Sequence, residues 1–209
     1  GLRISIRGSR GVDEHTFRTL FPGETWEIFK VANWRQIVDK PNILFITTDT
    51  QRCDTLRCMG SEWAISPNLD RLAAEGILFN QAHTSAPVCM PARSCLITGL
   101  HTPIHGAIEN GTTRKTGFPT FPDLLKDQGY HNIMIGKTHF GQIPDGFDVV
   151  IDSEYKEYLT ENGYDPDDLK VQPTPIPEEH FRETWLVNRT MKEIDQVKDG
   201  SAPFFAFCS

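Results

Sequence analysis

The sequence predicts an α/β protein in which a mostly parallel sheet lies between helices. Three short segments, residues 42–48, 131–136 and 203–209, are apolar and rich in β-branched or aromatic residues. They are apolar throughout rather than at every second residue, which is typical of strands buried on both faces. Helix-forming segments alternate with them along the chain, and this alternation favours parallel strands joined by helical crossovers.

The first predicted helix follows the opening strand and covers residues 66–76, with the sequence SPNLDRLAAEG. Ser66 is a residue type favoured as an N-cap, Pro67 fits the first helical position, and Gly76 is a common helix stop. The next segment, ILFNQAH at residues 77–83, is interpreted as a further strand because of its apolar opening.

Two more helices are predicted to have proline in their first turn. One begins near Pro91 and ends at Gly99, and the other has Thr120 as its N-cap, Pro122 in its first turn and Gly129 at its end. Each segment therefore has its own start and stop signals.

The last part of the chain predicts a long helix and a final strand. Residues 177–200 carry apolar side chains near the helical period, which predicts an amphipathic helix. Residues 145–177 are rich in Pro, Asp and Glu and are interpreted as an excursion over the surface. Residues 23–40 are compatible with another helix. A buried strand at residues 203–209 needs a following element to cover it, so we expect the domain to continue beyond it.

The composition is that of an ordinary globular protein, with 209 residues of which 38% are hydrophobic and 23% charged. The net charge of −7 argues against nucleic acid or an anionic membrane as the main partner. Five scattered cysteines indicate no disulfide framework and no zinc site. No apolar run approaches the roughly 18 residues of a membrane span. No secretory leader is visible, which favours a cytoplasmic location over a periplasmic or secreted one.

One segment, PVCMPARSCLITG at residues 87–99, places a cysteine close to a proline and an arginine. Because Pro91 fits the first turn of a helix, Cys89 comes just before the helix N-terminus, where unpaired N–H groups and the helix dipole favour negative charge. Arg93 can fold back over the same place and offer a forked donor to an oxyanion. The pattern suits an anionic nucleophile and an anionic substrate. A small buried cysteine at a helix cap is the alternative interpretation.

Further candidate residues follow the predicted strands. Asp49 comes at the carboxyl end of the first strand, where ligands bind in open α/β sheets, although an aspartate there is also a common turn or cap residue. Lys137 and His139 follow the strand at residues 131–136. Residues two apart can point the same way and bind one anionic oxygen; otherwise they are two solvated loop residues.

Taken in order, these motifs resemble those of the type I sulfatases, whose signature is Cys-x-Pro-Ser/Ala-Arg followed by a short apolar helix and Thr-Gly. CMPARSCLITG matches it, and GYHNIMIGKTHFG at residues 129–141 is similar to the family's second signature, with Asn132 where Ser or Thr is usual. PNILFITTDTQRCD at residues 41–54 resembles the family's first strand, and PFFAFCS at residues 203–209 resembles a later one. The resemblance implies the alkaline-phosphatase-like α/β/α sandwich, truncated at its C-terminus.

This resemblance makes residues 40–209 the N-terminal portion of a sulfatase catalytic domain, preceded by an extension of unknown role at residues 1–39. It implies that a separate formylglycine-generating maturation enzyme, which needs Pro91 and Arg93, oxidises Cys89 to formylglycine. The hydrated aldehyde attacks the sulfur of a sulfate ester, and its second hydroxyl then expels the sulfate. A Ca²⁺ or Mg²⁺ ion holds the diol and the sulfate oxygens.

The same resemblance assigns the metal ligands to Asp49, Thr50 and Cys89. Thr50 stands where the family usually has Asp, Asn or Gln, so it offers only a hydroxyl and a backbone carbonyl. Gln51 is the conceivable substitute. The rest of the family's metal ligands lie beyond the final strand of this sequence, and one carboxylate with formylglycine is a poor calcium site, because the ion takes about 6 to 8 oxygens.

Catalysis is assigned by the resemblance to Cys89 together with Arg93, Lys137 and His139. Lys137 and His139 bind sulfate, and one of them helps to protonate the leaving oxygen. His105 and Asn110 are candidates for substrate binding, because the family often has His-Gly and Asn at these offsets. A structural hydrogen bond explains either residue as well.

Three functions stay open at this point. Hydrolysis of sulfate monoesters is the first, and hydrolysis of phosphonate monoesters or phosphodiesters, which shares the formylglycine motif and the fold, is the second. A truncated non-catalytic domain that binds an anion or a partner is the third. The sequence leaves open whether the substrate is a sulfated sugar, choline sulfate or an aryl sulfate, and it predicts neither a nucleic acid nor a membrane as a partner.

Overall fold

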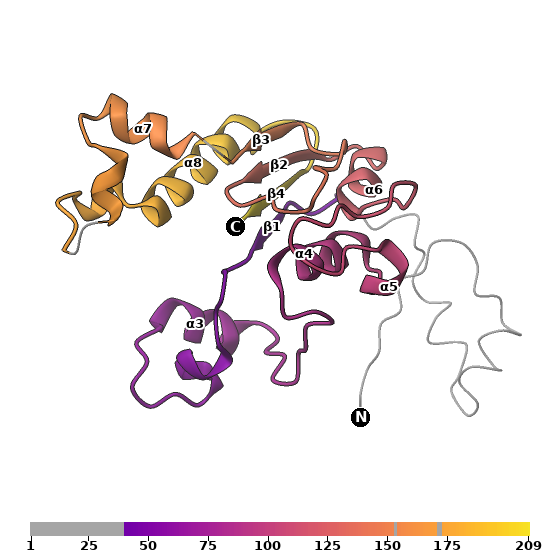
Figure 1. The fold of residues 1–209 in the computed structure, drawn as a ribbon, viewed down its shortest axis with the longest axis horizontal. Coiled ribbons are helices and arrows are strands. Elements are labelled where there is room, and N and C mark those ends of the chain that lie inside the picture. Colours follow the sequence, from indigo (N-terminus) through magenta and orange to yellow (C-terminus); the bar gives the residue numbers. More distant parts are fainter. Residues whose placement is uncertain (1–39, 153, 171–172) are drawn as a thin grey trace, which may run out of the picture. The chain divides into compact units, whose positions relative to one another are not determined.

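A computed structural model describes residues 40–152, 154–170 and 173–209 of the chain (Figure 1). All strands and helices named below belong to the unit formed by residues 41–209. The helix considered at residues 23–40 falls almost entirely on positions outside the described residues, so it stays a prediction.

In the described part, four strands form one parallel sheet in the order β1-β4-β2-β3. The strands are β1 (Ile43–Ile46), β2 (His131–Ile135), β3 (Val149–Ile151) and β4 (Phe204–Cys208). β4 lies between β1 and β2, so that Phe205 is opposite Ile43 on one side and Asn132 on the other. The parallel sheet predicted from the sequence is confirmed, and its strands all end at the same edge.

Helices cover both faces of this sheet (Figure 1). The α-helices are α3 (Pro67–Glu75), α4 (Cys89–Thr98), α5 (Thr102–His105), α6 (Phe121–Asp127), α7 (Tyr155–Glu161) and α8 (Arg182–Val197). The short 3₁₀-helices are η1 (Cys53–Thr55), η2 (Arg57–Met59), η3 (Pro166–Lys170) and η4 (Glu178–His180). Among the described residues, none of these helices has the length and apolar composition needed to cross a bilayer.

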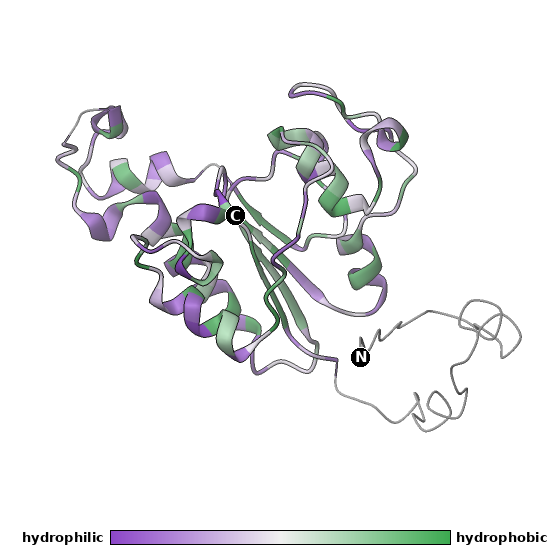
Figure 2. Cartoon of the chain, turned by 90° about the horizontal axis from the view of Figure 1, so that it is seen from below, coloured by the Kyte–Doolittle hydropathy of each residue, from purple (hydrophilic) through white to green (hydrophobic). Residues whose placement is uncertain are grey.

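The core consists of two apolar clusters, one on each face of the sheet. Ile133 and Ile135 of β2 pack in the cluster that contains Trp185 of α8. Met134 lies between them in sequence and points to the other face, where it packs in the cluster with Ile97 of α4. Figure 2 shows the strands as mostly hydrophobic segments between the helices. Burial on both faces explains why β2 and β4 are apolar without alternation.

β1 differs from this expectation. Its residues are alternately half-buried and exposed, and Leu44 and Ile46 are 52% and 64% exposed. The prediction that this strand is buried on both faces is therefore wrong for the described chain. The physical reason is its edge position: within the described residues β1 has β4 as its only partner strand, and no helix covers Leu44 or Ile46.

The helix ends show which start signals act as predicted. Thr120 caps α6 in a capping box, in which its side chain accepts a hydrogen bond from the Asp123 amide while the Asp123 carboxylate accepts one from the Thr120 amide. Pro67 is the first residue of α3, but Ser66 makes no side-chain cap hydrogen bond. Its hydroxyl instead accepts a hydrogen bond from the Arg57 amide at 3.0 Å, which ties α3 to η2.

The strand expected at residues 77–83 is not formed, and this prediction was wrong. Ile77 and Phe79 are 82% and 74% exposed, and no strand of the described sheet lies beside them. An apolar run becomes a strand only where a neighbouring strand satisfies its backbone, and a single-sequence pattern does not reveal such a partner.

The segment at residues 145–177 is also more ordered than the sequence indicates. It contains β3, which pairs with β2, and α7, whose Leu159 is fully buried in the core. The interpretation as a surface excursion was wrong. β3 has only three residues, and a strand this short gives no clear pattern within a segment rich in Pro, Asp and Glu. The helix predicted at residues 177–200 is present but shorter, since η4 precedes it and α8 begins at Arg182.

Candidate active site

The carboxyl-terminal edge of the sheet brings together three segments that are far apart in sequence. Asp49 follows β1, Lys137 follows β2, and Cys89 is the first residue of α4. Backbone hydrogen bonds hold these strand ends in place: the Thr47 amide donates to the carbonyl of Cys208 at 2.9 Å, and the Lys137 amide donates to the carbonyl of Ser209 at 3.0 Å. Polar side chains therefore cluster where open α/β sheets bind their ligands.

Asp49 is at the centre of this cluster. One of its carboxylate oxygens accepts a hydrogen bond from Lys137 Nζ, 88 residues away in sequence. Its other oxygen, Oδ1, lies 4.0 Å from Cys89 Sγ, 40 residues away in sequence. The hydrogen bond from Lys137 lowers the pKa of the Asp49 carboxyl below its ordinary value, and the charge of Arg93 lowers it further. Asp49 thus contacts two of the other predicted site residues, Lys137 and Cys89.

Arg93 connects α4 to the segment after β2. Its side chain is buried, and Nη1 donates a hydrogen bond of 2.7 Å to the backbone carbonyl of Lys137. Burial lowers the pKa of the Arg93 guanidinium, while Asp49 and Cys89 act in the opposite direction. The guanidinium stays protonated because its ordinary pKa is far above neutrality. Arg93 therefore places a positive charge beside the Asp49–Cys89 pair and fixes the position of Lys137.

Asn110 holds the N-terminus of α4. Val88 at the N-cap position makes no side-chain cap hydrogen bond. Instead, Asn110 Oδ1 accepts a hydrogen bond of 3.0 Å from the Met90 amide, from 20 residues further along the chain. This is the function of an N-cap supplied from outside the helix, because it satisfies one of the free amides of the first turn. Asn110 thus lies beside Cys89 through the backbone.

His105 lies in the packing between α4 and α5. It is fully buried, its Nδ1 accepts a hydrogen bond of 3.1 Å from the Ala107 amide, and its Nε2 contacts Cys95 Sγ at 3.2 Å. An accepting Nδ1 places the proton on Nε2, which then donates to the sulfur. Burial, followed by the charge of Arg114, lowers the pKa of His105 and favours the neutral ring. Both ring nitrogens are therefore engaged within the protein, so the geometry favours the structural interpretation of this residue.

His139 and Thr50 have backbone conformations rare for residues with a side chain. Their φ angles are +44° and +59°. Such conformations cost roughly 1–3 kcal/mol and occur preferentially at functional sites. The Nδ1 atom of His139 is buried without a hydrogen-bond partner among the described residues, and its Nε2 is not so enclosed. Nε2 is therefore the ring atom that a ligand can reach.

The predicted metal ligands form only part of a metal site. Thr50 Oγ1 lies 3.4 Å from Asp49 Oδ1, and Cys89 contacts the same oxygen. The side-chain amide of Gln51 is used elsewhere, since it donates to Thr55. Within the described residues no group of three or more His, Cys, Asp or Glu side chains converges. Because Ca²⁺ takes about 6 to 8 oxygens, these residues alone do not fit a complete calcium site.

An open depression of about 270 Å³ adjoins the cluster. It is lined by Lys137, Thr138, His139, Asp152 and Arg182. Asp152 and Arg182 were not among the residues singled out from the sequence. Asp152 lies directly after β3, and a position at a strand end is the signal that could have identified it. β3 was not predicted from the sequence, so this signal was missed.

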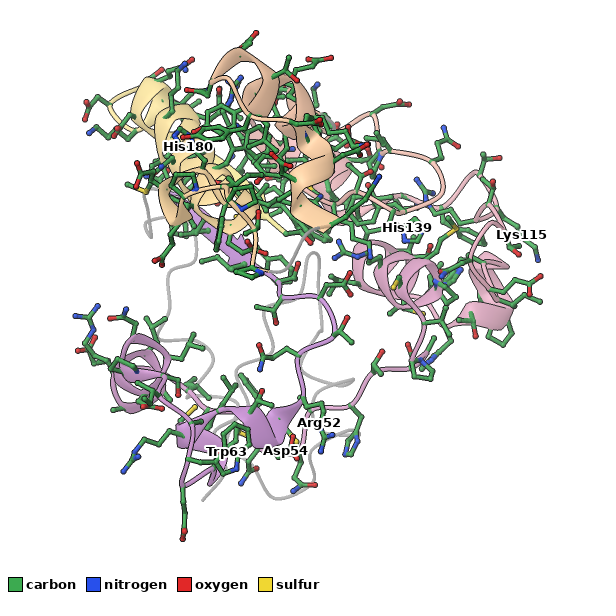
Figure 3. All side chains as sticks on the ribbon, turned by 60° about the vertical axis from the view of Figure 1, so that its left-hand side comes forward. Arg52, Asp54, Trp63, Lys115, His139 and His180 are labelled. Atoms are coloured by element: carbon green, nitrogen blue, oxygen red, sulfur yellow. The ribbon has the colours of Figure 1, made fainter. Side chains whose placement is uncertain are left out.

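Another polar pair after β1 belongs to a different region. The Arg52 guanidinium donates to Asp54 at 2.9 Å, and both side chains are largely exposed. Figure 3 shows this pair near Trp63 and apart from His139. The pair therefore stabilises the segment around η1 and does not contribute to the cluster at the sheet edge.

Comparison with solved structures defines the class of the protein. A phosphonate monoester hydrolase of Agrobacterium radiobacter superposes with a TM-score of 0.70 at 22% identity, over 80% of this chain and 40% of that one. A protein solved in complex with its substrate D-glucosamine-2-N,6-O-disulfate superposes with a TM-score of 0.63 at 24% identity, over 81% and 34% of the two chains. The parallel sheet with helices on both faces is thus the alkaline-phosphatase-like fold.

Within this class, the sulfatase family model matches residues 41–209, and the chain belongs to the sulfatase family. An N-acetylglucosamine-6-O-sulfatase of Bacteroides thetaiotaomicron is 35% identical over 130 residues, which is 61% of this chain and 23% of the relative. An uncharacterised sulfatase of Escherichia coli is 37% identical over 130 residues, 58% of this chain and 26% of the relative. The chain therefore spans about a quarter of the length of these two curated relatives.

Proposed function

We propose that this chain carries the nucleophile half of a sulfuric ester hydrolase, with formylglycine made from Cys89 as the nucleophile and a divalent cation bound beside it. One observation carries the proposal: Asp49, Cys89 and Lys137 meet at the carboxyl edge of the sheet although they are 40 to 88 residues apart. Membership of the sulfatase family supports the same chemistry.

The positive groups of the cluster are suited to an anionic ester. Lys137 pairs with Asp49, which contacts Cys89, and Arg93 adds a second cation that interacts with both Asp49 and Cys89. Preorganised cations lower the cost of the charge that develops on the transferred group. When a sulfate group binds, Lys137 Nζ has to exchange its hydrogen bond with Asp49 for one with a sulfate oxygen. The carboxylate of Asp49 is then free for the cation.

His139 is the candidate acid for the leaving alcohol. Its Nε2 is the accessible ring nitrogen, while Nδ1 is enclosed. His139 lines the depression, and we assign its Nε2–H as the donor of a proton to the departing oxygen. The alcohol then leaves as a neutral molecule and not as an alkoxide. The left-handed backbone at His139 directs this ring and costs stability that an ordinary loop residue does not require.

Two groups would complete the site. Formylglycine supplies a hydrated aldehyde as the nucleophile, and Ca²⁺ or Mg²⁺ supplies charge neutralisation when bound. Asp49 and the oxidised residue 89 are the ligands that this chain contributes to the ion, and the remaining ligands come from outside the described residues. We propose a formylglycine-generating enzyme as the partner that modifies Cys89.

Turnover by the matured chain tests this proposal. The chain, joined to the part of the protein that supplies the remaining metal ligands, is co-expressed with a formylglycine-generating enzyme, loaded with Ca²⁺, and assayed with 4-nitrophenyl sulfate and with a phenyl phosphonate monoester. We expect sulfate release to be the faster reaction, to vanish in Cys89→Ala and to persist in Cys95→Ala, which removes a cysteine of the same helix outside the cluster. Faster turnover of the phosphonate ester than of the sulfate ester would contradict the proposal and would indicate a phosphonate monoester hydrolase. Binding without turnover of either ester would favour a non-catalytic anion-binding domain.

A further inference from the structure

The depression beside the cluster contains more charged residues than the proposed reaction uses. Lys137 and His139 line it and act on the sulfate group. Asp152, after β3, and Arg182, at the start of α8, line the same depression and have no function in that reaction. Because these residues line one open depression of about 270 Å³, Asp152 and Arg182 are the charged groups next to the position of the sulfate ester.

Arg182 is available to a ligand. Its side chain is exposed, and neither an ion pair nor a hydrogen bond joins its guanidinium to another residue in the described part of the chain. The neighbouring arginine of the same helix, Arg189, is by contrast paired with Glu193 at 3.2 Å. A free guanidinium with a planar set of donors is suited to a carboxylate or a sulfate.

Asp152, which lines the same depression, carries the opposite charge. Its Oδ2 accepts a hydrogen bond of 3.1 Å from the Thr138 hydroxyl, which fixes the carboxylate. Its Oδ1 makes no hydrogen bond to a described residue and can accept one from a ligand hydroxyl. All five lining residues carry polar or charged groups, so the depression offers several hydrogen-bonding and ionic partners to a polar ligand.

We propose that Arg182 and Asp152 form a specificity subsite for the alcohol part of a sulfated saccharide that carries a second anionic group. Arg182 binds the second anion, and Asp152 accepts a hydrogen bond from a ring hydroxyl. The inference rests on the proposed function, because it takes the sulfate bound at Lys137 and His139 as its starting point. It adds the class of leaving alcohol, which the cluster itself does not define.

The test compares two sugars that differ in one anion. The full chain, labelled with ¹⁵N, is titrated with N-acetylglucosamine 6-sulfate and with glucosamine 2-N,6-O-disulfate, and dissociation constants are taken from amide shifts at residues 137–139 and at Arg182. Methyl sulfate, too small to reach Arg182, serves as the probe of the sulfate position alone. Each titration is repeated on Arg182→Gln and on Lys192→Gln, which removes an exposed cation from the same helix outside the depression.

We expect the disulfate to bind more tightly than the monosulfate, and Arg182→Gln to weaken disulfate binding about tenfold or more, as expected for loss of one charge-assisted contact. Methyl sulfate binding should stay within about twofold in both variants. Equal affinity for the two sugars would overturn the subsite, and so would an Arg182→Gln effect no larger than that of Lys192→Gln. In either case, binding of methyl sulfate at residues 137–139 would still support the proposed function. Failure of methyl sulfate to shift residues 137–139 would overturn both.

Discussion

At the scale of single residues, the site is centred on the carboxylate of Asp49 and the two cations near it. Lys137 forms an ion pair with this carboxylate, and Arg93 adds a second positive charge. Both cations lower the pKa of Asp49, so the carboxylate stays ionised over a wider pH range. The contribution of the pair to stability is complete above the ordinary carboxyl pKa and is lost as the pH falls through the lowered pKa of Asp49. Because Asp49 is exposed, solvent reduces this contribution.

Replacing Lys137 by methionine tests this coupling. Lys137→Met removes the cation and keeps the aliphatic stem, so the pKa of the Asp49 carboxyl should rise toward its ordinary value. NMR titration of the carboxyl carbon measures it. Lys170→Met is the matched control, since Lys170 pairs with Asp167 in an exposed pair elsewhere. An Asp49 pKa that is the same in Lys137→Met and in the native chain would show that the ion pair does not form in solution.

At the scale of elements, the start of α4 determines where Cys89 lies. Val88 cannot cap the helix with its side chain, and Asn110 takes over that function through the Met90 amide. At the other end of α4, Gly99 has a φ of +69°, the left-handed conformation that commonly ends helices. Arg93, one turn into the helix, connects it to the end of β2. The helix is thus held in place at the turn that bears Cys89.

Removing the Asn110 side chain should loosen that turn. Asn110→Ala leaves the Met90 amide without its partner and should lower the free energy of unfolding by about 1 kcal/mol, measured by urea denaturation. Hydrogen exchange of the Met90 amide should accelerate. Asn110→Asp should keep most of the stability, because a carboxylate also accepts the bond and is favoured at a helix N-terminus.

The exposed Asn188 on α8 provides the control. Asn188→Ala changes the same chemical group without removing a hydrogen bond that holds the site, so it should leave stability within about 0.5 kcal/mol and Met90 exchange unchanged. Equal destabilisation by Asn110→Ala and Asn188→Ala would contradict the capping function of Asn110.

At the scale of the whole described unit, the sequence predicted the elements that have strong local signals. The parallel sheet and the capped helix α6 follow from patterns of a few residues each, and the resemblance to the sulfatases placed Asp49 and Cys89 in one site. What could not be predicted depends on partners distant in sequence. Residues 77–83 have the composition of a strand but no neighbouring strand, whereas β3 is a strand of three residues that exists because β2 pairs with it.

The same distinction holds within the site. The motif residues were recognisable as a type of site, but their contacts were not: His105 faces Cys95, and Asn110 acts on the backbone of Met90. Arg182 could not be identified from the sequence, because its position in the depression depends on where α8 begins. Position along the chain therefore did not predict what each of these residues contacts.

The most direct test is mass spectrometry of Cys89 in the 209-residue chain co-expressed with a formylglycine-generating enzyme. Trypsin separates residues 72–93, which contain Cys89, from residues 94–114, which contain Cys95. We predict that the first peptide loses about 18 Da, the mass change from thiol to aldehyde, which lies off the usual oxidation series of cysteine. The Cys95 peptide should remain a thiol. An unmodified thiol in both peptides would contradict the assignment of Cys89 as the nucleophile precursor.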